Sequence, residues 1–188
     1  GNSIAKDAKA VLNTLQPIER EVESNDGKRT FLLRIKPYRS PNNVIDGTVI
    51  TLVDISERKR LERARAHLAA IVQSSEDAIV GHDLEGIITS WNRGASAIFG
   101  YAESEILGHP MSLLLSEHQI DEWPENLKLL RLGRSIADFE VRRVTKDNRQ
   151  IDVSLRISPI RDDAGVIVGG SAVARDISEH KGAERRVA

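Results

Sequence analysis

The sequence contains no cysteine among its 188 residues. Disulfides, thiolate nucleophiles, thiolate metal sites and flavin photochemistry through a cysteinyl adduct are therefore excluded. No apolar run approaches the roughly 20 residues that a membrane-spanning helix needs. The first residues, GNSIAKDAKA, also lack the apolar stretch of a signal peptide. We therefore expect a cytoplasmic protein with no membrane partner.

A surplus of either charge is missing as well. Lys and Arg number 27 while Asp and Glu number 28, which gives a formal net charge of −1. Without a basic surplus, electrostatics gives no reason to expect nucleic acid as the main partner. What remains is an ordinary globular composition, with 40% hydrophobic and 29% charged residues. The length suits one good core or two small ones.

An internal repeat is the most informative feature of the sequence. The phrase DISERK at 54–59 recurs as DISEHK at 176–181, and LRIKPYR at 33–39 recurs as LRISPIR at 155–161. Both pairs are 122 positions apart (176 − 54). We interpret these stretches as two copies of one structural unit. The same offset places residue 1 in the middle of the second copy, so we expect that the first copy lacks its front half and that a longer protein was cut.

The spacing of apolar residues in the second copy predicts strands first, then short helices, then strands again. Period-two alternation is clearest at 151–157, where Ile, Val and Leu alternate with Asp, Ser and Arg. Asn92 can cap a first short helix that Gly100 ends. The order predicts an α+β fold, a five-stranded antiparallel sheet with short helices on one face. The expected elements are strands at 78–82 and 87–91, helices at 103–107, 111–115 and 124–132, and strands beginning near 136, 151 and 166.

Two segments resemble a known family. EDAIVGHDLEGIITSWNRGASAIFGYAESEILGHP resembles the opening half of a PAS domain and ARDISEHK its closing signature, so this resemblance covers residues 76–181. Residues 12–59 resemble the second half of the PAS-like domain that adjoins chemotaxis-type methyltransferases in bacterial signalling fusions. No methyl transfer is expected here, because the methyltransferase itself is absent from these residues.

The resemblance implies a domain organisation in four parts. Residues 1–55 are expected to be the truncated C-terminal half of a first PAS domain, with three strands. A helical connector at 56–75 follows, then a complete PAS domain at 76–181, and the start of an output helix at 182–188.

The connector carries an apolar stripe at alternating steps of three and four residues. This spacing predicts a two-stranded coiled coil and hence a homodimer. The stripe spans only about two heptads, fewer than the three or four that define a coiled coil. Packing of an amphipathic helix on its own domains therefore stays an alternative. The stripe residues are Leu61, Ala64, Leu68 and Ile71.

The repeated Asp-Ile-Ser triplets stand where a strand is expected to end and a helix to begin. Capping chemistry is sufficient to explain them, because Asp and Ser oxygens accept hydrogen bonds from the first amides of a helix. The resemblance implies a further role, in which the junction couples strain in the sheet to the outgoing helix. The signal-transfer candidates are Asp54, Ile55 and Ser56 in the first copy and Asp176, Ile177 and Ser178 in the second.

PAS domains can enclose haem, flavin or a metabolite between sheet and helices, and many bind nothing. The position of a haem ligand falls closer to Trp123 than to His118, which we expect on a surface loop, and tryptophan cannot ligate iron in that way. Trp91 and Asn92 could face a flavin, yet the roles of a buried aromatic residue and a helix cap account for them without any ligand. We expect no cofactor, with Trp91, Asn92 and Trp123 as the only candidate contacts.

Catalytic patterns are missing. His67 lies on the connector helix, but Leu68, Ala69 and Ala70 follow it where a phosphoacceptor histidine would precede an acidic residue. The histidines show no metal-ligand spacing, and there is no phosphate-cradling glycine loop or nucleophile elbow. We therefore expect no enzyme activity.

The prediction for function is a sensory and signal-relay module of a bacterial chemotaxis-type or two-component signalling protein, with the neighbouring domains of the parent protein as partners. Two alternatives stay open. One is a ligand-free assembly and dimerisation module, and the other is a fragment of a methyltransferase or sensor kinase.

Overall fold

A computed structural model describes residues 2–42, 44–120 and 123–179 of the chain. The chain divides into two compact units, Gly1–Leu68 and Ala69–Ala188. The segment 182–188, expected to start an output helix, lies outside the described residues. No helix among the described residues is long and apolar enough to cross a membrane.

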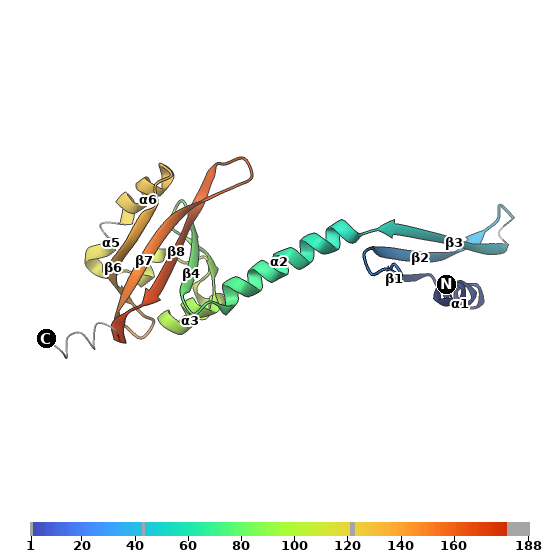
Figure 1. Cartoon of the computed structure of the whole chain (residues 1–188), viewed down its shortest axis with the longest axis horizontal. Helices are drawn as coiled ribbons and strands as arrows, with labels where there is room; N and C mark the ends of the chain where they lie inside the picture. The colour runs from blue at the N-terminus through green and yellow to red at the C-terminus, as the bar shows by residue number, and fades with distance from the viewer. Residues whose placement is uncertain (1, 43, 121–122, 180–188) are drawn as a thin grey trace. The chain divides into compact units, whose positions relative to one another are not determined.

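The first unit is a three-stranded antiparallel sheet with a helix on one face (Figure 1). Sequence patterns do not single out this helix, α1. It buries Val11 against Leu33 and Ile35, which together form the core of the unit. The strands pair in the order β1-β2-β3, so β3 lies at an edge of the sheet. The elements are α1 (Asn2–Thr14), β1 (Ile18–Glu23), β2 (Thr30–Arg39), β3 (Ile45–Asp54) and the connecting helix α2 (Ser56–Ser74).

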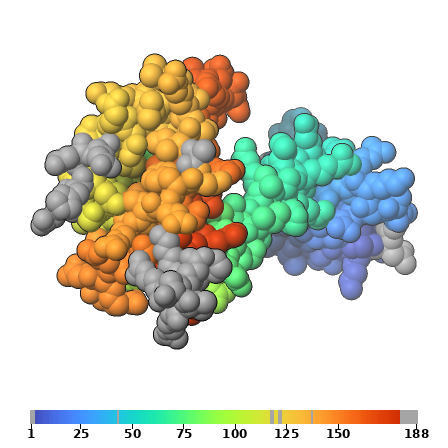
Figure 2. Space-filling view, turned by 60° about the vertical axis from the view of Figure 1, so that its left-hand side comes forward, coloured from blue at the N-terminus to red at the C-terminus, as the bar shows by residue number. Residues whose placement is uncertain are grey.

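The second unit contains a five-stranded sheet in the order β5-β4-β8-β7-β6, and all of its strand pairs are antiparallel. This confirms the predicted α+β class. In the space-filling view of Figure 2, the yellow helical segments lie alongside the orange strands. The elements are β4 (Ala78–Asp83), β5 (Ile88–Trp91), α3 (Arg93–Phe99), α4 (Glu103–Ile106), the 3-10 helix η1 (Met111–Leu114), α5 (Glu117–Ile120), α6 (Trp123–Arg131), β6 (Ile136–Val144), β7 (Gln150–Arg161) and β8 (Ile167–Asp176).

The repeat seen in the sequence extends to the pairing register of the strands. The offset of 122 that relates the two sequence copies carries the bounds of β3 onto those of β8. In the first unit Phe31 pairs with Asp54, and in the second Val153 pairs with Asp176. Each pair of strands also has its irregularity at the matching place, before Arg39 and before Arg161. The two copies therefore share one β-hairpin geometry.

The core of the second unit fills the space between the sheet and its helices. Trp91 and Phe99 form a tilted aromatic pair with ring centroids 5.7 Å apart. Leu155 and Ile157 of β7 and Leu130 of α6 are buried with them. This core fixes the ends of β4, β7 and β8, where the candidate site lies.

Candidate functional site: the strand-to-helix junctions

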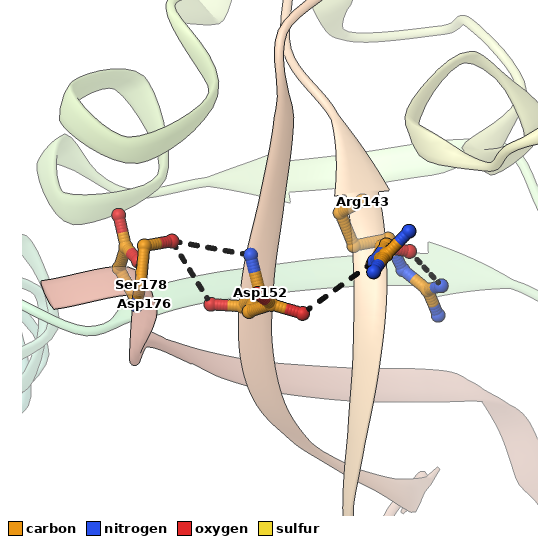
Figure 3. A network of polar contacts seen from close by, with 5 residues as sticks. Arg143, Asp152, Asp176 and Ser178 are labelled. Atoms are coloured by element: carbon orange, nitrogen blue, oxygen red, sulfur yellow. Dashed lines mark hydrogen bonds and ion pairs between the residues drawn. The ribbon is translucent and has the colours of Figure 1, made fainter. Parts of the chain in front are cut away.

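The turn after β8 is fastened to the neighbouring strand β7 (Figure 3). The Ser178 amide donates to Oδ1 of Asp176 at 2.8 Å. The Asp152 amide donates to Oγ of Ser178 at 3.1 Å, and this hydroxyl lies 3.5 Å from the Asp152 carbonyl oxygen. The Ile177 amide donates to the same carbonyl at 2.9 Å. Each residue of the Asp176–Ser178 triplet thus holds the chain in place where the strand ends.

The junction after β3 repeats these contacts. The Ser56 amide donates to Oδ1 of Asp54 at 2.9 Å, and the Thr30 amide donates to Oγ of Ser56 at 2.9 Å. The Ile55 amide donates to the Thr30 carbonyl at 2.9 Å. Hydrogen bonds from the hydroxyl and amide of Ser56 hold the pKa of Asp54 below its ordinary value. The predicted capping chemistry is therefore present in both copies.

At the other end of α2, Asn92 joins three elements of the second unit. Its Oδ1 accepts from the amides of Ile79 at 2.9 Å and Ala95 at 2.8 Å. Its Nδ2 donates to the carbonyl oxygens of Val72 and Asp77, both at 3.0 Å. Asn92 is buried, and these four bonds use all the donors and acceptors of its amide group. The residue predicted as a helix cap for α3 also connects the last turn of α2 to β4.

A close backbone approach reinforces the contact of α3 with the end of α2 and the 75–77 loop. The Arg93 amide donates to Oε1 of Gln73 at 2.9 Å. A Cβ added to Gly94 would lie 2.4 Å from the Asp77 carbonyl oxygen and 2.7 Å from that of Ser75, closer than real Cβ atoms come. Only glycine at position 94 lets α3 begin directly against the 75–77 loop.

One ion pair connects the 75–77 loop, which follows α2, to the end of β8. Nε and Nη2 of Arg175 donate to Oδ1 and Oδ2 of Asp77, each at 2.9 Å. The hydrogen bonds from Arg175 lower the pKa of Asp77, although partial burial opposes this. Asp77 follows α2, and Arg175 directly precedes Asp176. Sequence reasoning missed this pair, because only the β4–β8 register of the structure, continued beyond Ala78 and Ala174, places the two residues opposite each other.

The candidate cofactor contacts belong to the packed core. Nε1 of Trp91 donates to Oγ of Ser96 at 3.0 Å and to the Tyr101 carbonyl at 3.2 Å. Trp123 borders a cavity between sheet and helices, whereas Trp91 and Asn92 do not. The cavity has a volume of about 20 Å³, which is room for about one water molecule. As it stands it has no space for haem or flavin. The lining residues are Val80, Phe99, Met111, Leu114, Trp123, Arg143, Leu155, Ile157, Ala172 and Ala174.

His82 and Arg143 are among the buried polar side chains that sequence reasoning did not single out as buried. Nδ1 of His82 lies 2.8 Å from the Asp83 carbonyl oxygen, and its Nε2 has no hydrogen-bond partner within the described part of the chain. Burial lowers the pKa of His82. Arg143 is buried beside the cavity and donates from Nη1 to Oε1 of Gln119 at 2.8 Å. Residue 118, expected on a loop, lies in the helix α5, and its side chain is outside the described residues.

The predicted dimer stripe lies on a helix whose side chains face solvent. No residue of α2 is buried. The stripe residues Leu61, Leu68 and Ile71 are all more than half exposed, and Ala64 is exposed as well. No cluster of three or more potential metal ligands occurs among the residues that the structure describes.

Two family models match the chain. The PAS fold model matches residues 66–177, and a second PAS domain model matches residues 2–56. The chain therefore belongs to the PAS family and carries a tandem PAS module. The PAS fold is generally a sensory and non-catalytic one, and neither matched segment is a catalytic domain.

The sequence relatives include proteins named as sensors and as signal transduction kinases. The chain is 28% identical over 118 residues to the signal transduction histidine-protein kinase AtoS of Escherichia coli, covering 63% of this chain and 19% of AtoS. It is 24% identical over 144 residues to the sensor protein FixL of Bradyrhizobium diazoefficiens, covering 72% of this chain and 28% of FixL. The chain spans less than a third of either relative. It corresponds to a sensory module of such signalling proteins.

Solved structures agree with the fold. The PAS domain of an HTR-like protein from Haloarcula marismortui has a TM-score of 0.57 at 25% identity, covering 64% of this chain and 98% of that domain. A PAS domain from Colwellia psychrerythraea has a TM-score of 0.55 at 25% identity, covering 63% and 98%.

Proposed function

We propose that the chain is a non-catalytic relay that passes a conformational signal from α2, through the second PAS unit, to the helix that begins at Ser178. The observation that carries this proposal is the bidentate ion pair between Asp77 and Arg175. It joins the residue that follows the incoming helix to the residue that precedes the outgoing triplet. The named relatives, a signal transduction histidine-protein kinase and a sensor protein, support the same role.

Short contacts supply the route. A shift of the last turn of α2 moves the Val72 carbonyl oxygen, which Asn92 holds at 3.0 Å. Asn92 in turn holds the Ile79 amide of β4 and the Asp77 carbonyl. Because two hydrogen bonds join Asp77 to Arg175, the same shift reaches the end of β8. Rigid elements joined by satisfied hydrogen bonds are the arrangement through which two sites bias one another.

Amide hydrogen exchange tests the relay. Asp77→Asn removes the charge that holds Arg175, and we expect faster exchange at Ile177 and Ser178. The matched control is Asp138→Asn, because Asp138 forms a similar bidentate pair with Arg156 at 3.0 and 2.5 Å. This pair lies beside the Asp77–Arg175 pair, but it joins β6 to β7 and does not hold Arg175. Equal effects of the two substitutions on Ile177 and Ser178 would reject the relay.

We also propose that the chain acts in the cytoplasm as a homodimer assembled through Leu61, Ala64, Leu68 and Ile71. Their exposure supports this, since apolar side chains at coiled-coil spacing gain stability when a second helix covers them. Native mass spectrometry tests it with Leu68→Asp and, as a control off the stripe, Ala66→Asp. A dimer that survives Leu68→Asp, or a wild-type monomer at all concentrations, contradicts the proposal.

The parent protein is proposed to be a two-component or chemotaxis-type signalling protein. The sensor-kinase relatives favour the two-component form, and the resemblance of residues 12–59 favours the methyltransferase fusion. The small cavity in the second unit favours a relay that works without a bound ligand over one that senses a cofactor. An absorption spectrum and a native mass of the purified chain test this. Visible absorbance or extra mass would show a bound ligand and contradict the ligand-free relay.

A further inference from the structure

His82 has a buried ring nitrogen without a partner. The residue is 1% exposed, and its Nδ1 lies 2.8 Å from the Asp83 carbonyl oxygen, which fits a neutral ring that donates from Nδ1. Nε2 is then an acceptor, and no group among the residues that the structure describes donates to it. Because buried polar atoms are almost always paired, an exception calls for a physical reason.

The strand β8 leaves room for this ring through two successive glycines. Gly170 pairs with His82, and a Cβ on Gly170 would lie 2.6 Å from His82 Nε2. A Cβ on Gly169 would overlap the His82 carbonyl oxygen. Glycine in the interior of a strand weakens that strand. The two glycines therefore cost the sheet stability, and the position of His82 accounts for both.

The helix α6 covers the same ring. Trp123 meets it in a T-shaped arrangement, with the ring centroids 5.3 Å apart and the planes at 67°. Cδ1 of Leu130 would lie 3.0 Å from the Cβ of a residue that replaced Gly170, so Leu130 packs at the place where Nε2 lies. The ring is therefore enclosed between the sheet and α6, and it reaches water only when α6 moves.

The elements around the ring offer little to stabilise a positive charge on it. The strand β5 has no charged side chain, and β8 has none from Ile167 to Ala174. On β4, Asp83 favours the charged ring, but burial opposes it more strongly and lowers the pKa of His82. The charged side chains of the described part of α6 are exposed, and they are Glu125, Lys128 and Arg131. A proton on Nε2 thus creates a buried donor that has no acceptor.

We propose that His82 is a proton-operated switch, in which a proton on Nε2 drives the ring away from Gly170 and displaces Trp123 together with α6. Protonation gives the ring a positive charge and a second N–H, and a charge without a partner is strongly disfavoured in an apolar interior. The sheet blocks one side of the ring, so the ring turns towards water past α6. The use of this movement as an input signal rests on the proposed relay, because β8 continues from Gly170 to Arg175.

A titration of the whole chain between pH 7 and pH 5, followed by NMR, tests the switch. We expect the ring signals of His82 and the indole N–H signal of Trp123 to change with one shared midpoint, below about 6.5. The chain has two tryptophans, and Trp91→Phe assigns their indole signals. His82→Gln is expected to abolish the change at Trp123. The matched control His109→Gln removes an exposed histidine of the same unit and should keep the change.

Three outcomes would overturn the switch. One is a Trp123 signal that titrates equally in His82→Gln, and another is a Trp123 signal that stays constant while His82 takes up its proton. The third is loss of all folded signals at the His82 midpoint, which marks acid unfolding of the unit. If His82→Gln does not fold, His82→Leu takes its place, since it also removes the titrating ring.

The same titration separates the switch from the relay. We expect the amide signals of Ile177 and Ser178 to follow the His82 midpoint in the unmodified chain. In Asp77→Asn they should stay constant while the Trp123 signal still changes. If Trp123 follows His82 but Ile177 and Ser178 never respond, the displacement of α6 is supported and the relay is rejected.

Discussion

The two units share a hairpin, a bulge and a junction, yet only the second has a closed core. Asp54 and Asp176 occupy the same place in the same register, and each accepts a hydrogen bond from the amide of the serine two residues later. Leu52 and Ala174 also occupy the same place, but one is half exposed and the other buried. Local sequence therefore sets the junction geometry, whereas burial depends on residues distant in the sequence.

The largest effect is expected from a matched pair of substitutions that shorten a buried side chain in each unit. Leu33 and Leu155 are counterparts, and both are buried. We expect Leu155→Ala to lower the free energy of unfolding of the second unit by about 2–5 kcal/mol, and Leu33→Ala to have a comparable cost in the first. Urea denaturation followed separately in each unit measures this. If Leu33→Ala leaves the free energy of unfolding unchanged, then Val11, Leu33 and Ile35 do not form a stabilising core in the first unit.

The second-largest expected effect is a difference between the two units in how the free energy of unfolding depends on pH. Burial lowers the pKa of His82 below the ordinary histidine value of about 6.5. Just below pH 6.5 the unfolded chain therefore binds a proton at His82 that the folded unit does not bind. The free energy of unfolding of the second unit should therefore fall as pH drops below about 6.5, by at most about 1.4 kcal/mol per pH unit. Urea midpoints of the second unit between pH 7 and pH 5 measure the slope.

A leucine substitution is the control for this pH effect. His82→Leu removes the titrating ring, so the second unit of that variant should lose the slope between pH 7 and pH 5. A slope that persists in His82→Leu would assign the acid sensitivity to another group. The first unit has no counterpart of His82 and should lack this component.

The junction serines give a third and smaller effect that should be equal in the two copies. Ser56→Ala and Ser178→Ala each remove a hydroxyl that accepts from the amide of the neighbouring strand, Thr30 or Asp152. We expect a loss of about 1 kcal/mol in each unit. Calorimetry of both variants checks it, and a large difference between them would show that the shared geometry hides unequal energetics.

The smallest effect is expected where the copies differ most at the surface. Arg175 of the second unit corresponds to Val53 of the first, so only the second has the pair with Asp77. Because the arginine is mostly exposed, Asp77→Asn should change the free energy of unfolding by less than about 1 kcal/mol. It should still change amide exchange at Ile177 and Ser178. A loss of several kcal/mol would make the pair a structural element instead of a connector.

Much of the site follows from local chemistry, and those parts were predictable. Asn92 caps α3 as expected because an amide side chain at that place meets the first free amides of the helix. The two Asp-Ile-Ser triplets were visible as a repeat. The roles assigned to them in signal transfer, and to Leu61 and Leu68 in dimerisation, stay predictions.

Other parts of the site could not be found without the tertiary structure. Asp77 and Arg175 are 98 positions apart, and nothing near either residue marks its partner. The burial of His82 depends on Trp123, whose ring lies 5.3 Å away, and on α6 packing over the sheet. The helix α1 lacked a pattern of its own and is identified by what it covers.

The sequence by itself determined the repeat, the strand alternation, the turns and the caps, because each rests on residues a few positions apart. Only the tertiary structure decided which residues are buried and which charges meet, because strand pairing brings together segments that the sequence keeps far apart. Ile50 and Leu52 show both sides of this. Their alternation places them on the inner face, and only the neighbouring strand and helices decide whether that face is covered.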